Sequence, residues 1–62
     1  MMTQVKEIVR ETRVTVERAD GRDLSIGDAQ AQAVDAIGAG WRAVDWRRLN
    51  YDRVEVVLRE AA

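Results

Sequence analysis

The hydrophobic pattern of this chain changes its period twice. Residues 12–18 alternate apolar side chains with polar or charged ones, which indicates a strand with one buried face. Residues 26–37 repeat apolar side chains every three or four positions, as an amphipathic helix does, and residues 41–60 return to alternation. Within 62 residues this pattern favours one small α+β domain of two layers. We therefore predict a ββαββ order, with one helix over about residues 26–38 packed on an antiparallel sheet of two hairpins.

The first strand is predicted over residues 5–18, which are rich in valine, isoleucine and threonine. A helical stripe also fits the start of this segment, but like charges stand four residues apart within residues 6–11 and oppose a helix. Strict alternation cannot bury both Ile8 and Val9, so we expect a bulge there. Strand, helix and disordered arm all stay open for residues 1–9.

A turn is predicted at Asp20-Gly21, because glycine accepts a positive φ without a steric penalty. A three-residue loop of Ala19, Asp20 and Gly21 places Val16 opposite Leu24 and predicts a short second strand over residues 22–24. The same register places like charges opposite each other on the other face: Glu17 with Asp23, and Arg18 with Arg22.

The helix should begin after Ser25, whose side chain is three residues before Asp28, the spacing of a capping box. Gly38 and Gly40 supply the signals for its end. Small side chains on the buried stripe would let the helix lie close to the sheet. The stripe consists of Ile26, Ala29, Ala33, Val34, Ala36 and Ile37.

A second hairpin is predicted from strands over Trp41–Leu49 and Arg53–Glu60, joined by a loop of Asn50, Tyr51 and Asp52. This register gives one apolar face and one face of opposite charges, whereas a shift by one residue mixes the two. It pairs Arg48 with Val54, Trp46 with Val56, Val44 with Leu58 and Arg42 with Glu60 on one face, and Arg47 with Glu55 on the other.

A small core follows from these elements. A chain of this size gains little net stability from burial alone, so self-association through the outer sheet face or an edge strand is a natural remedy, and we expect a homodimer. The predicted core residues are Val14, Val16, Leu24, Ile26, Ala33, Ile37, Val44, Trp46, Val56 and Leu58.

Composition excludes most catalytic chemistry. The chain has no cysteine and no histidine, so it has no thiolate nucleophile, no imidazole base and no zinc site of the usual kind. We expect no cofactor, no metal and no enzymatic activity. A formal net charge of -1 gives no overall attraction to nucleic acid. No apolar stretch is long enough to span a membrane, and a cytoplasmic protein is expected.

The segment Gly40–Arg53, with the sequence GWRAVDWRRLNYDR, holds every aromatic residue of the chain among four arginines. Aromatic faces beside guanidinium groups are typical of single-stranded nucleic-acid binding and of protein interfaces. A plainer interpretation places Trp46 in the core and leaves the arginines on a solvated face. The candidate partner-binding residues are Trp41, Arg42, Arg47, Arg48, Tyr51 and Arg53.

By elimination, the sequence predicts a small non-catalytic protein-protein interaction module. Small proteins of this composition are common among phage and mobile-element products that bind a host protein, so a host protein is the expected partner. The alternative is binding of RNA or single-stranded DNA through the second hairpin, which would weaken steeply as salt rises.

Overall fold

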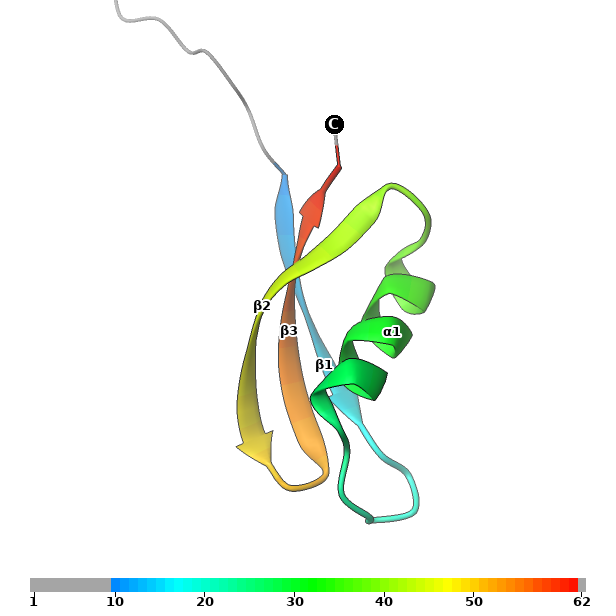
Figure 1. The fold of residues 1–62 in the computed structure, drawn as a ribbon, viewed down its shortest axis with the longest axis vertical. Coiled ribbons are helices and arrows are strands. Elements are labelled where there is room, and N and C mark those ends of the chain that lie inside the picture. The colour runs from blue at the N-terminus through cyan, green and yellow to red at the C-terminus, as the bar shows by residue number, and fades with distance from the viewer. Residues whose placement is uncertain (1–9, 62) are drawn as a thin grey trace, which may run out of the picture.

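The computed structural model describes residues 10–61 of the chain. Its elements are β1 (Glu11–Glu17), α1 (Ile26–Ile37), β2 (Trp41–Asn50) and β3 (Arg53–Glu60). The three strands form one antiparallel sheet in the order β1-β3-β2, and α1 packs against one face of it (Figure 1). We call this the inner face and the opposite one the outer face. The α+β prediction is confirmed, but the order is βαββ.

The second strand predicted over residues 22–24 is wrong, because β1 pairs with β3 and not with its sequence neighbour. Residues 18–25 form a loop whose backbone groups are satisfied in other ways. Leu24 N–H donates to the Tyr51 carbonyl at 2.8 Å, and Arg22 N–H donates to Asp20 Oδ1 at 3.0 Å. Leu24 is buried as predicted, but from this loop.

The β1–β3 register explains why the distant strand is the better partner. On the inner face Val14 is opposite Val56 and Val16 is opposite Val54. On the outer face the opposite charges meet, Glu11 with Arg59 and Glu17 with Arg53. The predicted hairpin with residues 22–24 would pair only three residues with β1 and would place like charges opposite each other. The predicted extension of the strand over residues 5–9 lies outside the described residues.

Helix α1 begins and ends where the sequence predicts. The Ser25 side chain accepts a hydrogen bond from Asp28 N–H at 3.2 Å, which caps the first turn. Gly38 ends the helix at a φ of 114°, and its N–H donates to the Val34 carbonyl. Ala29 is fully buried, so the small side chains allow α1 to lie close to the sheet.

The β2–β3 hairpin follows the predicted register only over residues 46–48. Its turn holds two residues, Tyr51 and Asp52, and not the predicted three, because Asn50 is opposite Arg53 and Leu49 is an extra residue. Arg48 is opposite Val54, Trp46 is opposite Val56 and Arg47 is opposite Glu55, as predicted. The register then shifts between Ala43 and Asp45, so that Val44 is an extra residue. The other predicted pairs are therefore wrong: Ala43 takes the place of Val44 opposite Leu58, Arg42 is opposite Arg59, and Trp41 is opposite Glu60.

The core differs from the predicted one at its β2 side. The bulge removes Val44 from the inner ladder and leaves it 39% exposed. Trp46 is 46% exposed and Ile37 is also exposed, so these three predictions are wrong. Val14 and Ile26 lie half-buried against the core. The fully or nearly fully buried residues are Val16, Leu24, Ala29, Ala33, Val54, Val56 and Leu58.

Candidate functional site

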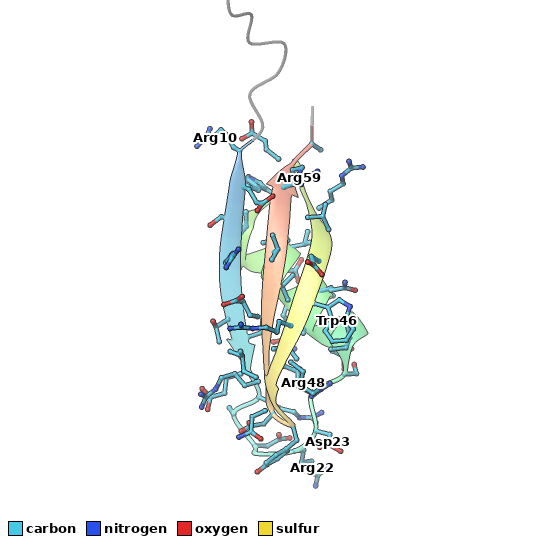
Figure 2. All side chains as sticks on the ribbon, turned by 90° about the vertical axis from the view of Figure 1, so that its left-hand side faces the viewer. Arg10, Arg22, Asp23, Trp46, Arg48 and Arg59 are labelled. Carbon is cyan, nitrogen blue, oxygen red and sulfur yellow. The ribbon has the colours of Figure 1, made fainter. Side chains whose placement is uncertain are left out.

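The outer face of the sheet is charged and turned away from α1 (Figure 2). Its ion pairs join β1 to β3: Arg59 Nη2 lies 3.2 Å from Glu11 Oε2, Arg53 Nη2 lies 3.7 Å from Glu17 Oε1, and Arg13 Nη1 lies 3.9 Å from Glu55 Oε1. These pairs are exposed, except that Glu55 is half-buried, so each contributes little to stability. They do neutralise most of the charge that the β1 side of this face would present to a partner.

The β2 side of the outer face carries Arg42 and Arg47. Within residues 10–61 neither side chain forms an ion pair, although Arg47 is opposite Glu55 in the register. Asp45 belongs to the same side, opposite Val57. Arg42 and Arg47 are therefore the predicted residues that remain best placed for a partner at this face.

Arg48 has a structural role. From the inner side of β2 its Nη2 donates to the Leu24 carbonyl at 2.7 Å, and its Nη1 donates to the carbonyls of Tyr51 at 2.9 Å and Asn50 at 3.2 Å. The guanidinium thus fastens the loop before α1 to the β2–β3 turn. Its donors are largely occupied, which makes it a poor candidate for binding a partner.

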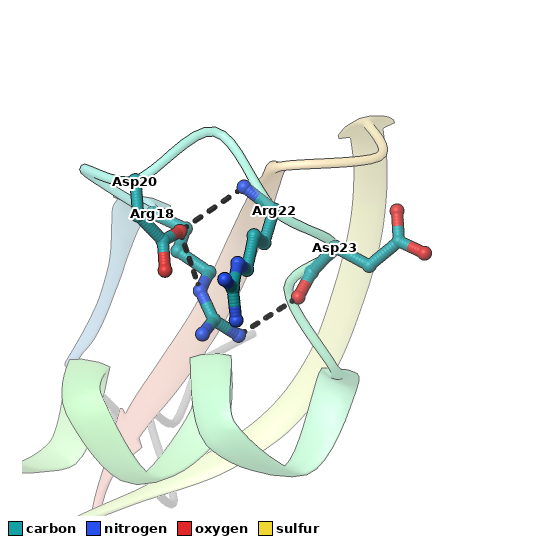
Figure 3. Close-up of polar contacts among 4 residues, drawn as sticks. All are labelled: Arg18, Asp20, Arg22 and Asp23. Carbon is teal, nitrogen blue, oxygen red and sulfur yellow. Dashed lines mark hydrogen bonds and ion pairs between the residues drawn. The ribbon is translucent and has the colours of Figure 1, made fainter.

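The loop of residues 18–25 is held by a second arginine (Figure 3). Arg18 Nε donates to Asp20 Oδ1 at 2.7 Å, and Arg18 Nη1 donates to the Asp23 carbonyl at 3.1 Å. The hydrogen bond from Arg18 holds the pKa of Asp20 below its ordinary value, and the Arg22 N–H adds to this effect. These contacts join residues of the same loop. We therefore infer that the loop has a structural role.

An open hollow of about 390 Å³ lies where this loop meets the β2–β3 turn. Its lining includes Leu24, which is buried, and Tyr51, which is 53% exposed. Asp23, Ser25 and Arg48 complete the lining. The hollow is wide and shallow, a shape that suits a protruding side chain of another protein better than an enclosed small molecule.

Exposed apolar side chains gather along β2. We call Val44, Trp46, Leu49 and Tyr51 the β2 surface; they are four of the five large exposed apolar side chains of the described residues. Figure 2 shows Trp46 beside β2, on the side of this strand away from β3. The fifth, Ile37, belongs to the end of α1.

The structure divides the predicted site residues among different places. Trp41 is half-buried against the core at the start of β2, and the length of the strand separates it from Tyr51. Arg42, Arg47 and Arg53 lie on the outer face, and Arg53 there pairs with Glu17. Only Tyr51 of the predicted set belongs to the β2 surface.

The exposure of Trp46, Val44 and Leu49 was not predicted from the sequence. One signal was available: Arg48 falls on the inner face of the predicted ladder, and a charged residue at such a position argues against full burial of this end of the face. The bulges that displace Val44 and Leu49 have no comparable signal, because neither position carries a glycine.

No group of three or more acidic side chains that could hold a metal ion exists among residues 10–61. No helix in this part of the chain has the length and hydrophobicity needed to cross a membrane. Comparison of the chain with protein-family models, curated proteins and solved structures finds no match. The surfaces described above are therefore the basis for a functional proposal.

Proposed function

We propose that this chain is a small non-catalytic protein-interaction module that binds a protein partner through the β2 surface. The observation that carries the proposal is the concentration of large exposed apolar side chains on one edge strand and its turn. Tryptophan and tyrosine are the residue types most enriched where interface binding energy concentrates. Trp46 at the free edge of β2 is the residue that we expect to contribute most.

Burial supplies the driving force. Trp46 leaves 46% of its surface in water, and covering an area of about 100 Å² contributes about 2.5 kcal/mol at about 25 cal/mol per Å². Arg42 and Arg47, on the outer side of the same strand, can form ion pairs at the rim of such an interface. An apolar centre beside charged residues is the usual composition of a protein interface.

The alternative, binding of single-stranded nucleic acid, needs aromatic faces and arginines on one surface. Here Trp46 and Trp41 occupy inner-face positions of β2, whereas Arg42 and Arg47 occupy outer-face positions. Ion pairs with glutamate take up Arg13, Arg53 and Arg59. This separation favours a protein partner over a nucleic acid.

The test is capture of a partner by the immobilised protein from a lysate of the host cell, with and without nuclease. We expect one stoichiometric protein that survives nuclease treatment. Its affinity should fall about tenfold or more for Trp46→Ser. Ile37→Ser is the matched control, because it removes an apolar side chain of similar exposure from the end of α1.

Two results would contradict the proposal. Capture that disappears with nuclease and weakens steeply as salt rises would assign the chain to nucleic-acid binding. Equal capture by the Trp46→Ser variant and the unaltered protein would remove the β2 surface from the interface.

A further inference from the structure

The two edges of the sheet differ in their capacity to pair with another strand. β2 is interrupted by register shifts at Val44 and Leu49, and the Trp46 N–H already donates to Asp45 Oδ1 at 2.8 Å. Bulges and occupied donors are what natural sheets use to prevent edge pairing. β1 pairs with β3 over residues 11–17 without any shift and contains no proline. Its free edge is therefore the one suited to pairing.

The hydrogen bonds to β3 show which backbone groups point to that edge. The Arg10 carbonyl accepts from Glu60 N–H, and Arg18 N–H donates to the Asp52 carbonyl. Because these groups alternate in an antiparallel strand, the even-numbered residues of β1 face β3. Glu11, Arg13, Thr15 and Glu17 then present their N–H and carbonyl groups at the free edge.

We propose that a second copy of this chain docks on the β1 edge in antiparallel register, with Thr15 opposite Thr15 of the second copy. The two three-stranded sheets would form one continuous sheet around a two-fold axis. This inference does not depend on the partner proposed for the β2 surface, which would lie at both outer ends of the joined sheet.

Charge and polarity select this register. On the outer face Arg13 meets Glu17 of the second copy, and the two-fold axis repeats the pair. On the inner face Val14 meets Val16 of the second copy, so that the half-buried Val14 gains cover. All paired residues within 13–17 are thus matched in charge or in polarity.

The neighbouring registers match less well. In the joined sheet, the inner-face side chains of one copy must lie beside the inner-face side chains of the other copy. The two-fold centre can therefore move along β1 only by whole residues, and each step changes the sum of the two paired residue numbers by two. A centre at Val14 places Glu11 opposite Glu17, and a centre at Arg13 places arginine opposite arginine. A centre at Thr12 pairs Glu11 with Arg13 but leaves Arg10 opposite Val14. A centre at Val16 places Val14 opposite Arg18, so among these centres the one at Thr15 has no conflict within residues 13–17.

The small core makes such an association useful. A chain of this length buries only about 60% of its unfolded surface, and a partner that binds only the folded state stabilises it by mass action. The pairing adds backbone hydrogen bonds at the free edge of β1, through N–H and carbonyl groups that make no bond to β3.

The test is analytical ultracentrifugation of the full chain over a range of concentrations. We expect a dimer for the unaltered protein. Arg13→Glu places glutamate opposite Glu17 twice, and Glu17→Arg places arginine opposite Arg13 twice. Each single variant should raise the dissociation constant about tenfold. The double variant Arg13→Glu/Glu17→Arg should restore it.

Recovery of the dimer in the double variant would distinguish a contact between the two copies from contacts within one copy. The exchange of charges leaves a glutamate at position 13 facing Glu55 and an arginine at position 17 facing Arg53 in each copy, so intramolecular ion pairs cannot account for a recovery. Thr15→Pro gives a second test, because the Thr15 N–H makes no bond to β3 and proline is tolerated at such a position. That variant should be monomeric and folded by circular dichroism.

Several results would overturn the inference. These are a monomer at all concentrations up to about 1 mM, and a dimer that tolerates both single reversals. A dimer lost in Trp46→Ser but kept in Arg13→Glu would place the contact at the β2 surface instead. If Thr15→Pro fails to fold, the charge exchange alone decides.

Discussion

At the scale of the residue, Arg48 shows how an exposed charged side chain can act within the fold. The sequence places it among the candidate partner-binding residues, but its guanidinium donates to three backbone carbonyls of the 18–25 loop and the β2–β3 turn. The planar, multiply donating guanidinium suits this role, and a lysine could not satisfy all three acceptors in the same geometry.

We expect Arg48→Met to lower the free energy of unfolding by about 1–2 kcal/mol, because the partly buried bond to Leu24 is lost while its apolar stem is kept. Arg47→Met, on the outer face of the same strand, should change it by less than about 0.5 kcal/mol. Urea denaturation followed by circular dichroism measures both. Equal losses would show that Arg48 acts only through general strand or charge effects.

At the scale of the element, the bulge in β2 decides which side chains of the strand reach the core. Val44 is the extra residue between the pairs Ala43–Leu58 and Asp45–Val57. β1 has no such residue, and each of its positions is opposite one position of β3. A one-residue change in length should therefore have opposite consequences in the two strands.

We expect deletion of Val44 to leave a regular ladder with the same pairs on both sides, and to change the free energy of unfolding by less than about 1 kcal/mol. Deletion of Thr15 shifts every preceding residue of β1 to the other face, and should unfold the protein. Amide chemical shifts and urea denaturation test the pair of deletions. A folded Thr15 deletion, or an unfolded Val44 deletion, would contradict the assigned register.

At the scale of the whole molecule, stability depends on a small set of side chains between α1 and the sheet. Val54, Val56 and Leu58 of the central strand are fully buried, between the two edge strands and under the helix. The single core of a domain of this size rarely supplies more than about 3–5 kcal/mol. A single large-to-small change in the central strand can remove most of it.

We expect Leu58→Ala to cost about 2–5 kcal/mol and to leave much of the protein unfolded at about 37 °C. Val57→Ala is the control, because Val57 is the adjacent residue on the outer face and only half-buried; it should cost about 1 kcal/mol or less. Thermal unfolding followed by circular dichroism measures both variants. A melting temperature unchanged by Leu58→Ala would show that the core lies elsewhere.

The prediction of the site from the sequence succeeded least where several elements meet. The aromatic and arginine segment forms a hairpin as predicted, but the six candidate residues taken from it lie in different places. Trp41 packs against the core and Arg48 donates to the Leu24 carbonyl, whereas Trp46, which was predicted to lie in the core, is 46% exposed. Which side chains a helix covers depends on its angle and position across the sheet, and no pattern within one segment contains that information.

The sequence by itself determined the elements whose signals are local. The Ser25 cap, the Gly38 stop and the position of the turn between β2 and β3 each depend on residues a few positions apart. Only the tertiary structure decided that β1 pairs with β3 across 48 positions, as Glu11 and Arg59 do, and that Trp46 remains exposed. A strand accepts any partner that matches its alternation, so the choice depends on which complete arrangement buries the most apolar surface and pairs the most charges.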